Sequence, residues 1–189
     1  MTRESGDRAA ARASRGLLIL TGASHTGKTS VARSILDLKG SPAALLGVDQ
    51  TLEHTLVRPP GDRWNEIPLA YELISLQTEA LLRAGWFIVL ESTFTHVPEE
   101  GPPEFHGGEI ERLVEIALAA GAPWSIVQLN AAESTVIERA EASCRLPLAI
   151  VTKTIALHRG AAMPAGTIQL QTESNPRQLA QSILAGFPH

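Results

Sequence analysis

Cysteine is nearly absent from this sequence, because Cys144 is the only one among 189 residues. A disulfide within the chain is therefore excluded, and such low cysteine use is typical of proteins in a reducing cytoplasm. We predict a cytoplasmic protein in which Cys144 is a buried or half-buried thiol that serves packing.

Long hydrophobic runs and a strong charge of one sign are also lacking. No apolar run approaches the roughly 20 residues that a membrane-spanning helix needs. The formal net charge is −4, which argues against binding to nucleic acid or to a membrane surface. We therefore predict no nucleic-acid or membrane partner. The composition, with 44% hydrophobic residues, is that of a globular protein and does not indicate an oligomeric state.

Residues 1–15 lack an apolar core and consist mainly of Arg, Ala, Ser and acidic residues. A secretory signal peptide needs such a core, and Glu4 and Asp7 argue against a transit peptide. We predict a disordered tail over residues 1–15, followed by one domain over residues 16–189.

Strand and helix patterns alternate along the rest of the sequence. Short apolar runs between turn residues predict strands at 17–21, 43–48, 86–90, 124–129 and 167–170. Apolar residues at helical spacing predict helices at 28–38, 64–84, 109–120, 132–142, 148–158 and 176–185. Residues 97–108, rich in Pro, Gly and Glu, are predicted to form a loop. The alternation predicts an α/β fold with a five-stranded parallel sheet and helices on both faces.

The segment between the first strand and the first helix matches the phosphate-binding pattern G-x-x-x-x-G-K-[ST] at every fixed position. The fixed positions are Gly22, Gly27, Lys28 and Thr29. In such a loop, backbone N–H groups surround the β-phosphate, and the N-terminus of the following helix attracts the anion. Lys28 would contact the β- and γ-phosphates, and the Thr29 hydroxyl would bind Mg²⁺.

The scarcity of lysine strengthens this assignment over a glycine-rich turn with an incidental lysine. The sequence has three lysines, and one of them stands where the motif needs it. We predict a three-layer P-loop NTPase fold that binds ATP and Mg²⁺, with His25 as a solvent-facing spacer. The predicted nucleotide-binding residues of the loop are Gly22, Ala23, Ser24, His25, Thr26, Gly27, Lys28, Thr29 and Ser30.

Signatures of other P-loop classes are missing. The guanine-binding pattern Asn-Lys-x-Asp is absent, which disfavours a GTPase. A motor or AAA-type ATPase would have Asp-Glu after an apolar strand, whereas this chain has Glu91 and Ser92 there. A small-molecule kinase fits better, because an acceptor hydroxyl needs a carboxylate near the γ-phosphate to take its proton.

Two carboxylates meet that requirement, because Asp49 follows the second predicted strand and Glu91 follows the third. In an open parallel sheet, ligands bind at the carboxyl ends of the strands, so both acids are expected to face the phosphate loop. Either would act as the base or hold a water on Mg²⁺. The alternatives are a helix N-cap for Asp49 and a solvated strand-end acid for Glu91.

Positive charge on the other side of the transferred phosphoryl group is expected from the region after the fourth strand. We assign Arg139 to the base or a phosphate, and Arg145 to the γ-phosphate from a small helical lid near residues 142–150. The alternative for both is a solvated arginine at a helix end.

An acceptor pocket is expected from aromatic and hydrogen-bonding residues after the second and third strands. For each of them, core packing or a polar surface position is the stronger alternative. These residues are Glu53, His54, Arg58, Arg63, Trp64, Tyr71, Thr93, Phe94 and His96. His106 is assigned to the loop over 97–108, without a partner at metal-ligand spacing.

Together, these motifs resemble the small P-loop kinases around chloramphenicol phosphotransferase and the zeta toxins, from residue 17 to about residue 183. The segments that carry the resemblance are GASHTGKT, LLGVDQTLEH, FIVLESTF, LNAAESTVIERAE and TIQLQTESNPRQLAQSI. The GVD tripeptide resembles chloramphenicol phosphotransferase, which implies that Asp49 is the catalytic base. The resemblance also implies that Asn175 and Pro176 border the adenine.

The predicted function is that of an ATP-dependent phosphotransferase that moves the γ-phosphate to a hydroxyl of a small molecule. Catalysis is assigned to Asp49, Lys28, Arg145 and Glu91, and Mg²⁺ binding to Thr29 and Glu91. Two alternatives stay open, a zeta-toxin-like kinase for a nucleotide sugar and a non-catalytic module that binds ATP.

Overall fold

The structure is a computed structural model that describes residues 15–40, 42–56, 66–97, 102–144, 146–173 and 175–188. The predicted tail lies outside the described residues except for Arg15, whose guanidinium donates a hydrogen bond to the Gly121 carbonyl at 2.8 Å. Arg58, Arg63, Trp64 and Arg145 also lie outside them.

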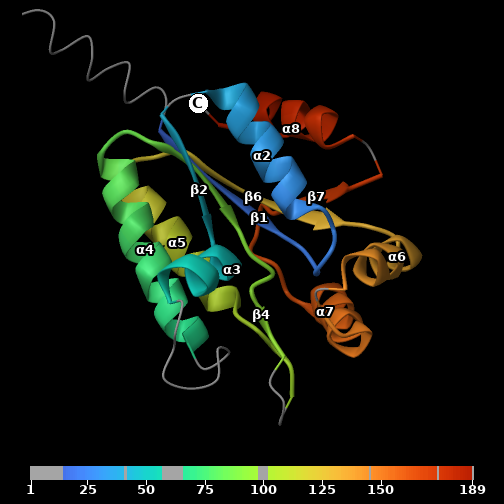
Figure 1. Ribbon diagram of the computed structural model, residues 1–189. Helices are drawn as coiled ribbons and strands as arrows, with labels where there is room; N and C mark the ends of the chain where they lie inside the picture. The colour runs from blue at the N-terminus through green and yellow to red at the C-terminus, as the bar shows by residue number, and fades with distance from the viewer. Residues whose placement is uncertain are drawn as a thin grey trace, which may run out of the picture.

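The centre of the fold is a parallel sheet of five strands, as predicted (Figure 1). Its strands are β1 (Gly16–Thr21), β2 (Ala43–Gly47), β3 (Phe87–Glu91), β6 (Trp124–Asn130) and β7 (Ile168–Gln171). Their order across the sheet is β2-β3-β1-β6-β7, so the first strand of the chain is the central one. The side chains of Leu17, Leu18, Ile19 and Leu20 in β1 are fully buried, because helices cover both faces of the sheet.

Two pairs of helices cover the two faces. Helices α2 (Lys28–Lys39) and α8 (Pro176–Ala185) pack on one face, and α4 (Ile67–Arg83) and α5 (Gly107–Ala119) pack on the other (Figure 1). Alternate residues of β1 pack into the two hydrophobic cores, one on each face of the sheet, because successive strand side chains point to opposite faces. Leu18 and Leu20 join the α2–α8 core, while Leu17 and Ile19 join the α4–α5 core. The predicted three-layer α/β fold is confirmed.

Two regions differ from the prediction. The second strand ends at Gly47, and Val48 begins a short helix, α3 (Val48–Gln50), which continues as a π-helical turn, η1 (Thr51–Thr55). The predicted loop over 97–108 contains β5 (Glu104–Phe105), which pairs antiparallel with β4 (Thr95–His96). Such two-residue strands lack the alternating pattern by which longer strands are recognised in a sequence.

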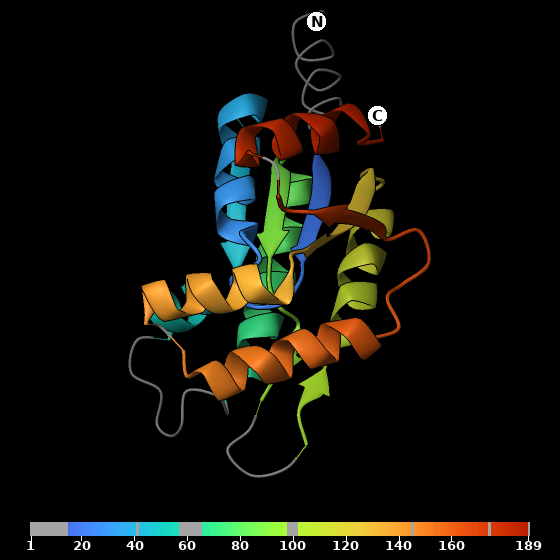
Figure 2. The same cartoon turned by 90° about the vertical axis from the view of Figure 1, so that its right-hand side faces the viewer.

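A helical pair, α6 (Glu133–Ser143) and α7 (Leu148–Gly160), lies beside the carboxyl ends of the strands (Figures 1 and 2). Ala23 of the phosphate loop packs with Val136 and Ala140 of α6 and with Val151 and Ile155 of α7. The two helices therefore support the phosphate loop through apolar contacts. Cys144, predicted to be buried or half-buried, is exposed at the end of α6.

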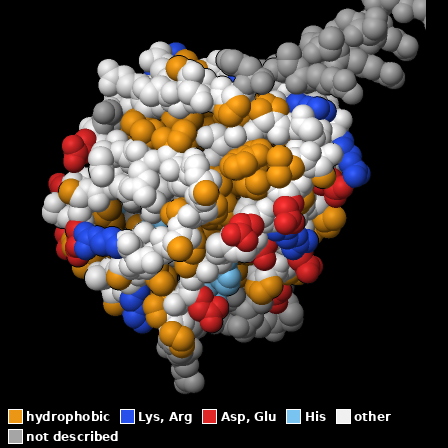
Figure 3. All heavy atoms as spheres, turned by 180° about the vertical axis from the view of Figure 1, so that it is seen from behind, with side chains coloured by type: hydrophobic (Ala, Val, Ile, Leu, Met, Phe, Trp, Pro, Cys, Tyr) orange, Lys and Arg blue, Asp and Glu red, His pale blue; other side chains and the backbone are white. Residues whose placement is uncertain are grey.

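The surface mixes apolar and charged side chains. On the face seen in Figure 3, hydrophobic side chains form patches between charged side chains of both signs. Leu76 of α4 and Leu118 of α5 are among the exposed large hydrophobic residues. No helix within the described residues combines the length and the apolar character that a membrane span requires.

Candidate functional site

The phosphate loop turns the chain from β1 into α2. Three of its residues have positive φ angles, namely Gly22 (140°), His25 (61°) and Gly27 (93°). A Cβ atom at Gly22 would overlap the carbonyl oxygen of Leu129 in β6, so this position requires glycine. The hydroxyl of Thr26 donates to the Ala23 carbonyl at 2.9 Å and holds the turn from inside.

Lys28 begins α2 and folds back over the loop. Its Nζ atom donates hydrogen bonds to the carbonyl oxygens of Gly22 at 2.9 Å and Ala23 at 2.8 Å. Burial lowers the pKa of Lys28 to about 8, while the charges of Glu91 and Asp49 oppose this shift. The ammonium group is therefore still mainly protonated at neutral pH, and an additional anion beside it would favour its charged form.

Glu91 ends β3 directly beside the phosphate loop. In the sheet it is level with Leu20 of β1 and with Gly47 of β2. The Thr29 side chain favours the charged form of its carboxylate, while Oε2 is buried without a hydrogen-bond partner among the described residues. Burial raises the pKa of Glu91, and the charge of Lys28 opposes the shift. A hydroxyl and a buried carboxylate oxygen are the kind of ligands that Mg²⁺ takes in proteins, so this pair fits the ion.

Asp49 lies on the neighbouring strand end, two residues beyond β2. Its charge acts on both Lys28 and Glu91, which places the three groups in one electrostatic cluster. The alternative role of a helix cap does not hold, because Gly47 is the N-cap residue of α3 and no side chain caps that helix. Unlike Glu91, Asp49 is exposed, so its carboxylate is accessible from solvent.

The α6–α7 pair contacts the loop through polar groups as well. Arg139 of α6 donates from Nη1 to the carbonyl of His25 at 3.3 Å, which places this predicted residue over the loop. The backbone N–H of Ser24 donates to the hydroxyl of Thr154 in α7 at 3.4 Å. Arg145 lies outside the described residues, so its role in a lid stays a prediction.

Asn175 and Pro176 lie after β7, two strands away from the loop in the sheet order. The Asn175 side chain accepts a hydrogen bond from the Arg177 backbone N–H at 2.8 Å and so caps α8. Pro176 is the first residue of that helix. Both residues are exposed. Their contact with adenine stays a prediction.

His158 of α7 is a buried residue at this site that the sequence analysis missed. Burial, and then the charge of Lys28, lower the pKa of His158 to about 4, so its ring is neutral at neutral pH. The Thr93 backbone opposes the shift slightly, but neither ring nitrogen makes a well-formed hydrogen bond with the described residues. The sequence feature that could have indicated His158 is its position one helical turn after Thr154, which places both residues on the same face of α7.

We expect this histidine to make the protein sensitive to acid. The unfolded chain binds the proton near pH 6.5 but the folded protein only near pH 4, so the free energy of unfolding falls as pH drops through that window. The expected loss is about 2–3 kcal/mol. In urea denaturation at pH 7 and pH 4.5, His158→Gln should lose less stability than the wild type and than the exposed-site control His54→Gln. Equal losses in all three proteins would contradict the assignment.

On the acceptor side, the structure separates core residues from surface residues. Tyr71 is buried and stacks on Phe94 with ring centroids 5.7 Å apart, as the packing alternative predicted. Its hydroxyl lies 3.3 Å from the Ser92 hydroxyl, next to Glu91. His54 is exposed. The expectation for His106 is wrong, because its ring lies close to His96 and Glu104 at metal-ligand spacing.

Known proteins share this architecture. The solved structures that resemble the chain include a gluconokinase from Sinorhizobium meliloti, with 19% identity, a TM-score of 0.60 and coverage of 90% of each chain. Another is the APS kinase of Mycobacterium tuberculosis in complex with AMPPNP and APS, with 14% identity, a TM-score of 0.62 and coverage of 90% of this chain and 96% of that chain. A tunicamycin resistance protein from Deinococcus radiodurans has 17% identity and a TM-score of 0.58, over 90% of this chain and 94% of that chain. At these identities the likeness establishes the fold.

The sequence itself matches a family model described as an AAA domain over residues 17–143, more than half of the chain. No curated protein matches the sequence significantly. The resemblance to chloramphenicol phosphotransferase and the zeta toxins is not confirmed by these matches and stays a prediction. The family carries the AAA description although this chain lacks Asp-Glu after the third strand. The chain, with its phosphate-binding loop on a five-stranded parallel sheet, belongs to this AAA domain family.

Proposed function

We propose that this protein is an ATP-dependent kinase that transfers the γ-phosphate to a hydroxyl group of a small molecule. The observation that carries the proposal is the cluster of Lys28, Glu91 and Asp49, in which two carboxylates from neighbouring strand ends act on the lysine of the phosphate loop. Phosphoryl transfer needs these parts close together, namely a cation for the phosphates, oxygen ligands for Mg²⁺ and a base for the acceptor.

The environments of the two carboxylates suggest a division of roles. Glu91 is buried beside Thr29, where an oxygen ligand would serve Mg²⁺ bound to the β- and γ-phosphates. Asp49 is exposed, so an acceptor hydroxyl would reach it from solvent and give up its proton there. Mg²⁺, when bound, neutralises charge on the phosphates. The chain itself supplies Lys28 and the loop N–H groups for the same purpose.

Arginine charge from the helical pair would complete the site. Arg139 already lies over the loop through its hydrogen bond to His25, so its guanidinium is placed to approach a nucleotide phosphate or base. Arg145, on the connection between α6 and α7, is proposed to reach the γ-phosphate when the pair closes over the nucleotide.

The structural relatives support a kinase but do not select an acceptor. The names of two of them, a gluconokinase and an APS kinase, refer to different acceptors on the same fold. The acceptor is therefore set by the segments around the strand ends rather than by the fold itself. A nucleotide-sugar acceptor of the zeta-toxin kind stays within the proposal as one class to be tested.

The test is a screen of ADP release by the purified full chain with Mg·ATP and a panel of sugars, nucleosides, nucleotide sugars and hydroxylated antibiotics. We expect at least one acceptor to raise ADP release well above the rate in water, with the phosphate recovered on the acceptor. The Asp49→Asn protein should bind ATP but lack this stimulation. Tight ATP binding without γ-phosphate transfer to any member of the panel would favour a non-catalytic nucleotide-binding module instead.

A further inference from the structure

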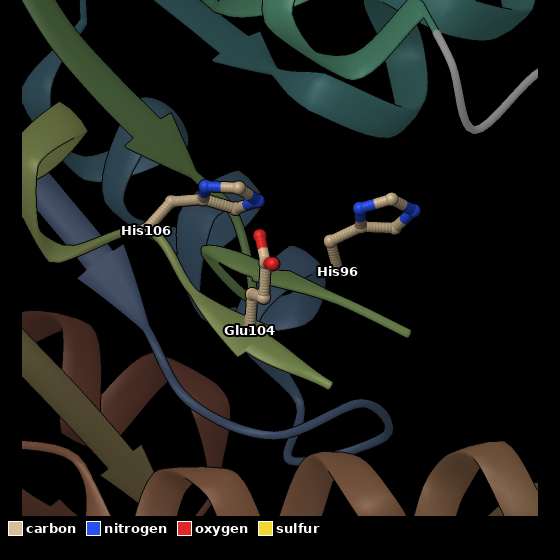
Figure 4. Close-up of side chains that lie close together, drawn as sticks. All are labelled: His96, Glu104 and His106. Carbon is tan, nitrogen blue, oxygen red and sulfur yellow. The ribbon is translucent and has the colours of Figure 1, made fainter. Parts of the chain in front are cut away.

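A second cluster of side chains lies on the small hairpin formed by β4 and β5. His96 and Glu104 are directly opposite each other in the antiparallel pair. His106 follows Glu104 by two residues and is the N-cap residue of α5, directly after β5. One ring nitrogen from each histidine and one carboxylate oxygen of Glu104 all lie within 4.8 Å of one another. Figure 4 shows the three side chains converging on one space beside the hairpin.

The backbone and the core hold this cluster in place. The N–H of His106 donates to the carbonyl of Phe94 at 2.7 Å, which extends the hairpin pairing to the residue that carries the third side chain. The His106 ring also lies against Tyr71 of the core, with ring centroids 5.8 Å apart. The two imidazole rings are nearly parallel, 6.2 Å apart. These contacts restrict the His106 ring before any ligand arrives.

One atom of the cluster lacks a partner in the described part of the chain. Nε2 of His106 is buried and makes no hydrogen bond there. Burying a polar nitrogen without a hydrogen-bond partner costs free energy, so a ligand that binds this nitrogen would stabilise the protein. A metal ion that accepts the lone pair of this nitrogen would remove the cost.

We propose that His96, Glu104 and His106 bind a divalent transition-metal ion, with Zn²⁺ as the best fit. Two imidazole nitrogens and one carboxylate oxygen form a donor set that suits zinc, whereas Mg²⁺ and Ca²⁺ prefer oxygen ligands alone. Tetrahedral ligands at about 2.1 Å from zinc are roughly 3.4 Å apart, so ligand atoms that lie within 4.8 Å of one another need to approach by at most about 1.4 Å to bind the ion. This site is separate from the proposed Mg²⁺ position at Thr29 and Glu91 and does not depend on the proposed kinase function.

Bound metal would join the two strands of the hairpin and fix it against the helices. Phe105, between Glu104 and His106, meets the His158 ring edge to face at 5.6 Å, so the hairpin also contacts α7. Three protein ligands leave a fourth position open for water or for an oxygen or nitrogen atom of another molecule.

The test is a Zn²⁺ titration of the metal-free full chain by isothermal calorimetry, in a Cys144→Ser background that removes the exposed thiol. We expect one Zn²⁺ per chain, a rise in the melting temperature with Zn²⁺, and no displacement by millimolar Mg²⁺. Replacement of the bound ion by Co²⁺ should give the visible absorption of a tetrahedral site. Glu104→Gln and His106→Gln should each weaken Zn²⁺ binding at least about tenfold.

His54→Ala is the matched control, because His54 is an exposed histidine outside the cluster, and it should bind Zn²⁺ like the parent protein. Glu104 is exposed, so Glu104→Gln is expected to remain folded, and circular dichroism checks this for both variants. The proposal is overturned if the parent chain binds no Zn²⁺. Binding that survives in Glu104→Gln and His106→Gln alike, or is lost equally in His54→Ala, would also overturn it.

Discussion

Replacing Lys28 by alanine is expected to lower the rate of γ-phosphate transfer by about 10³-fold or more, equivalent to roughly 4 kcal/mol of transition-state stabilisation. The Nζ atom is held at the mouth of the loop by the Gly22 and Ala23 carbonyls, within the field of two carboxylates. No other lysine of the chain can replace it, because Lys39 lies at the far end of α2 and Lys153 on the exposed side of α7.

The measurement is single-turnover transfer from γ-labelled ATP, with ATP affinity determined in parallel by calorimetry. Lys153→Ala is the matched control, since it removes the same charge from an exposed position on the helical pair, and it should leave the rate within about twofold of wild type. A Lys28→Ala protein that transfers phosphate at the wild-type rate would contradict the assigned role of the loop lysine.

Replacing Asp49 by asparagine is expected to lower kcat by about 10²- to 10⁴-fold while ATP binding is retained, because a general base contributes a factor of this size. Glu91→Gln should act differently. Because Glu91 is buried beside Thr29, its neutral replacement should raise the Mg²⁺ concentration needed for half-maximal activity. The comparison therefore separates the carboxylate that serves the acceptor from the one that serves the metal.

Initial rates across a Mg²⁺ series, measured with the acceptor found in the screen, distinguish the two variants. Asp37→Asn, an exposed acid on α2, is the control for a simple loss of negative charge and should behave like wild type. If Asp49→Asn kept full activity while Glu91→Gln lost it at every Mg²⁺ concentration, the roles would have to be exchanged.

The sequence determined the α/β architecture and the phosphate loop, because short local patterns of residues specify both. The apolar run before Gly22 and the helical spacing after Lys28 specify a strand, a turn and a helix without reference to the rest of the chain. The same holds for α8, predicted at 176–185 and found at Pro176–Ala185. Asp49 and Glu91 were found as strand-end acids because parallel strands bring their carboxyl ends to one edge.

Only the tertiary structure decided which distant side chains meet. The interaction of Thr29 with Glu91, the hydrogen bond from Arg139 to His25 and the burial of His158 near Lys28 join residues far apart in sequence. The cluster of His96, Glu104 and His106 escaped the sequence analysis because it depends on a hairpin of two-residue strands. Local propensity does not fix such a pairing. Packing against the core and the free energy of long-range contacts fix it, and no short segment of sequence encodes these.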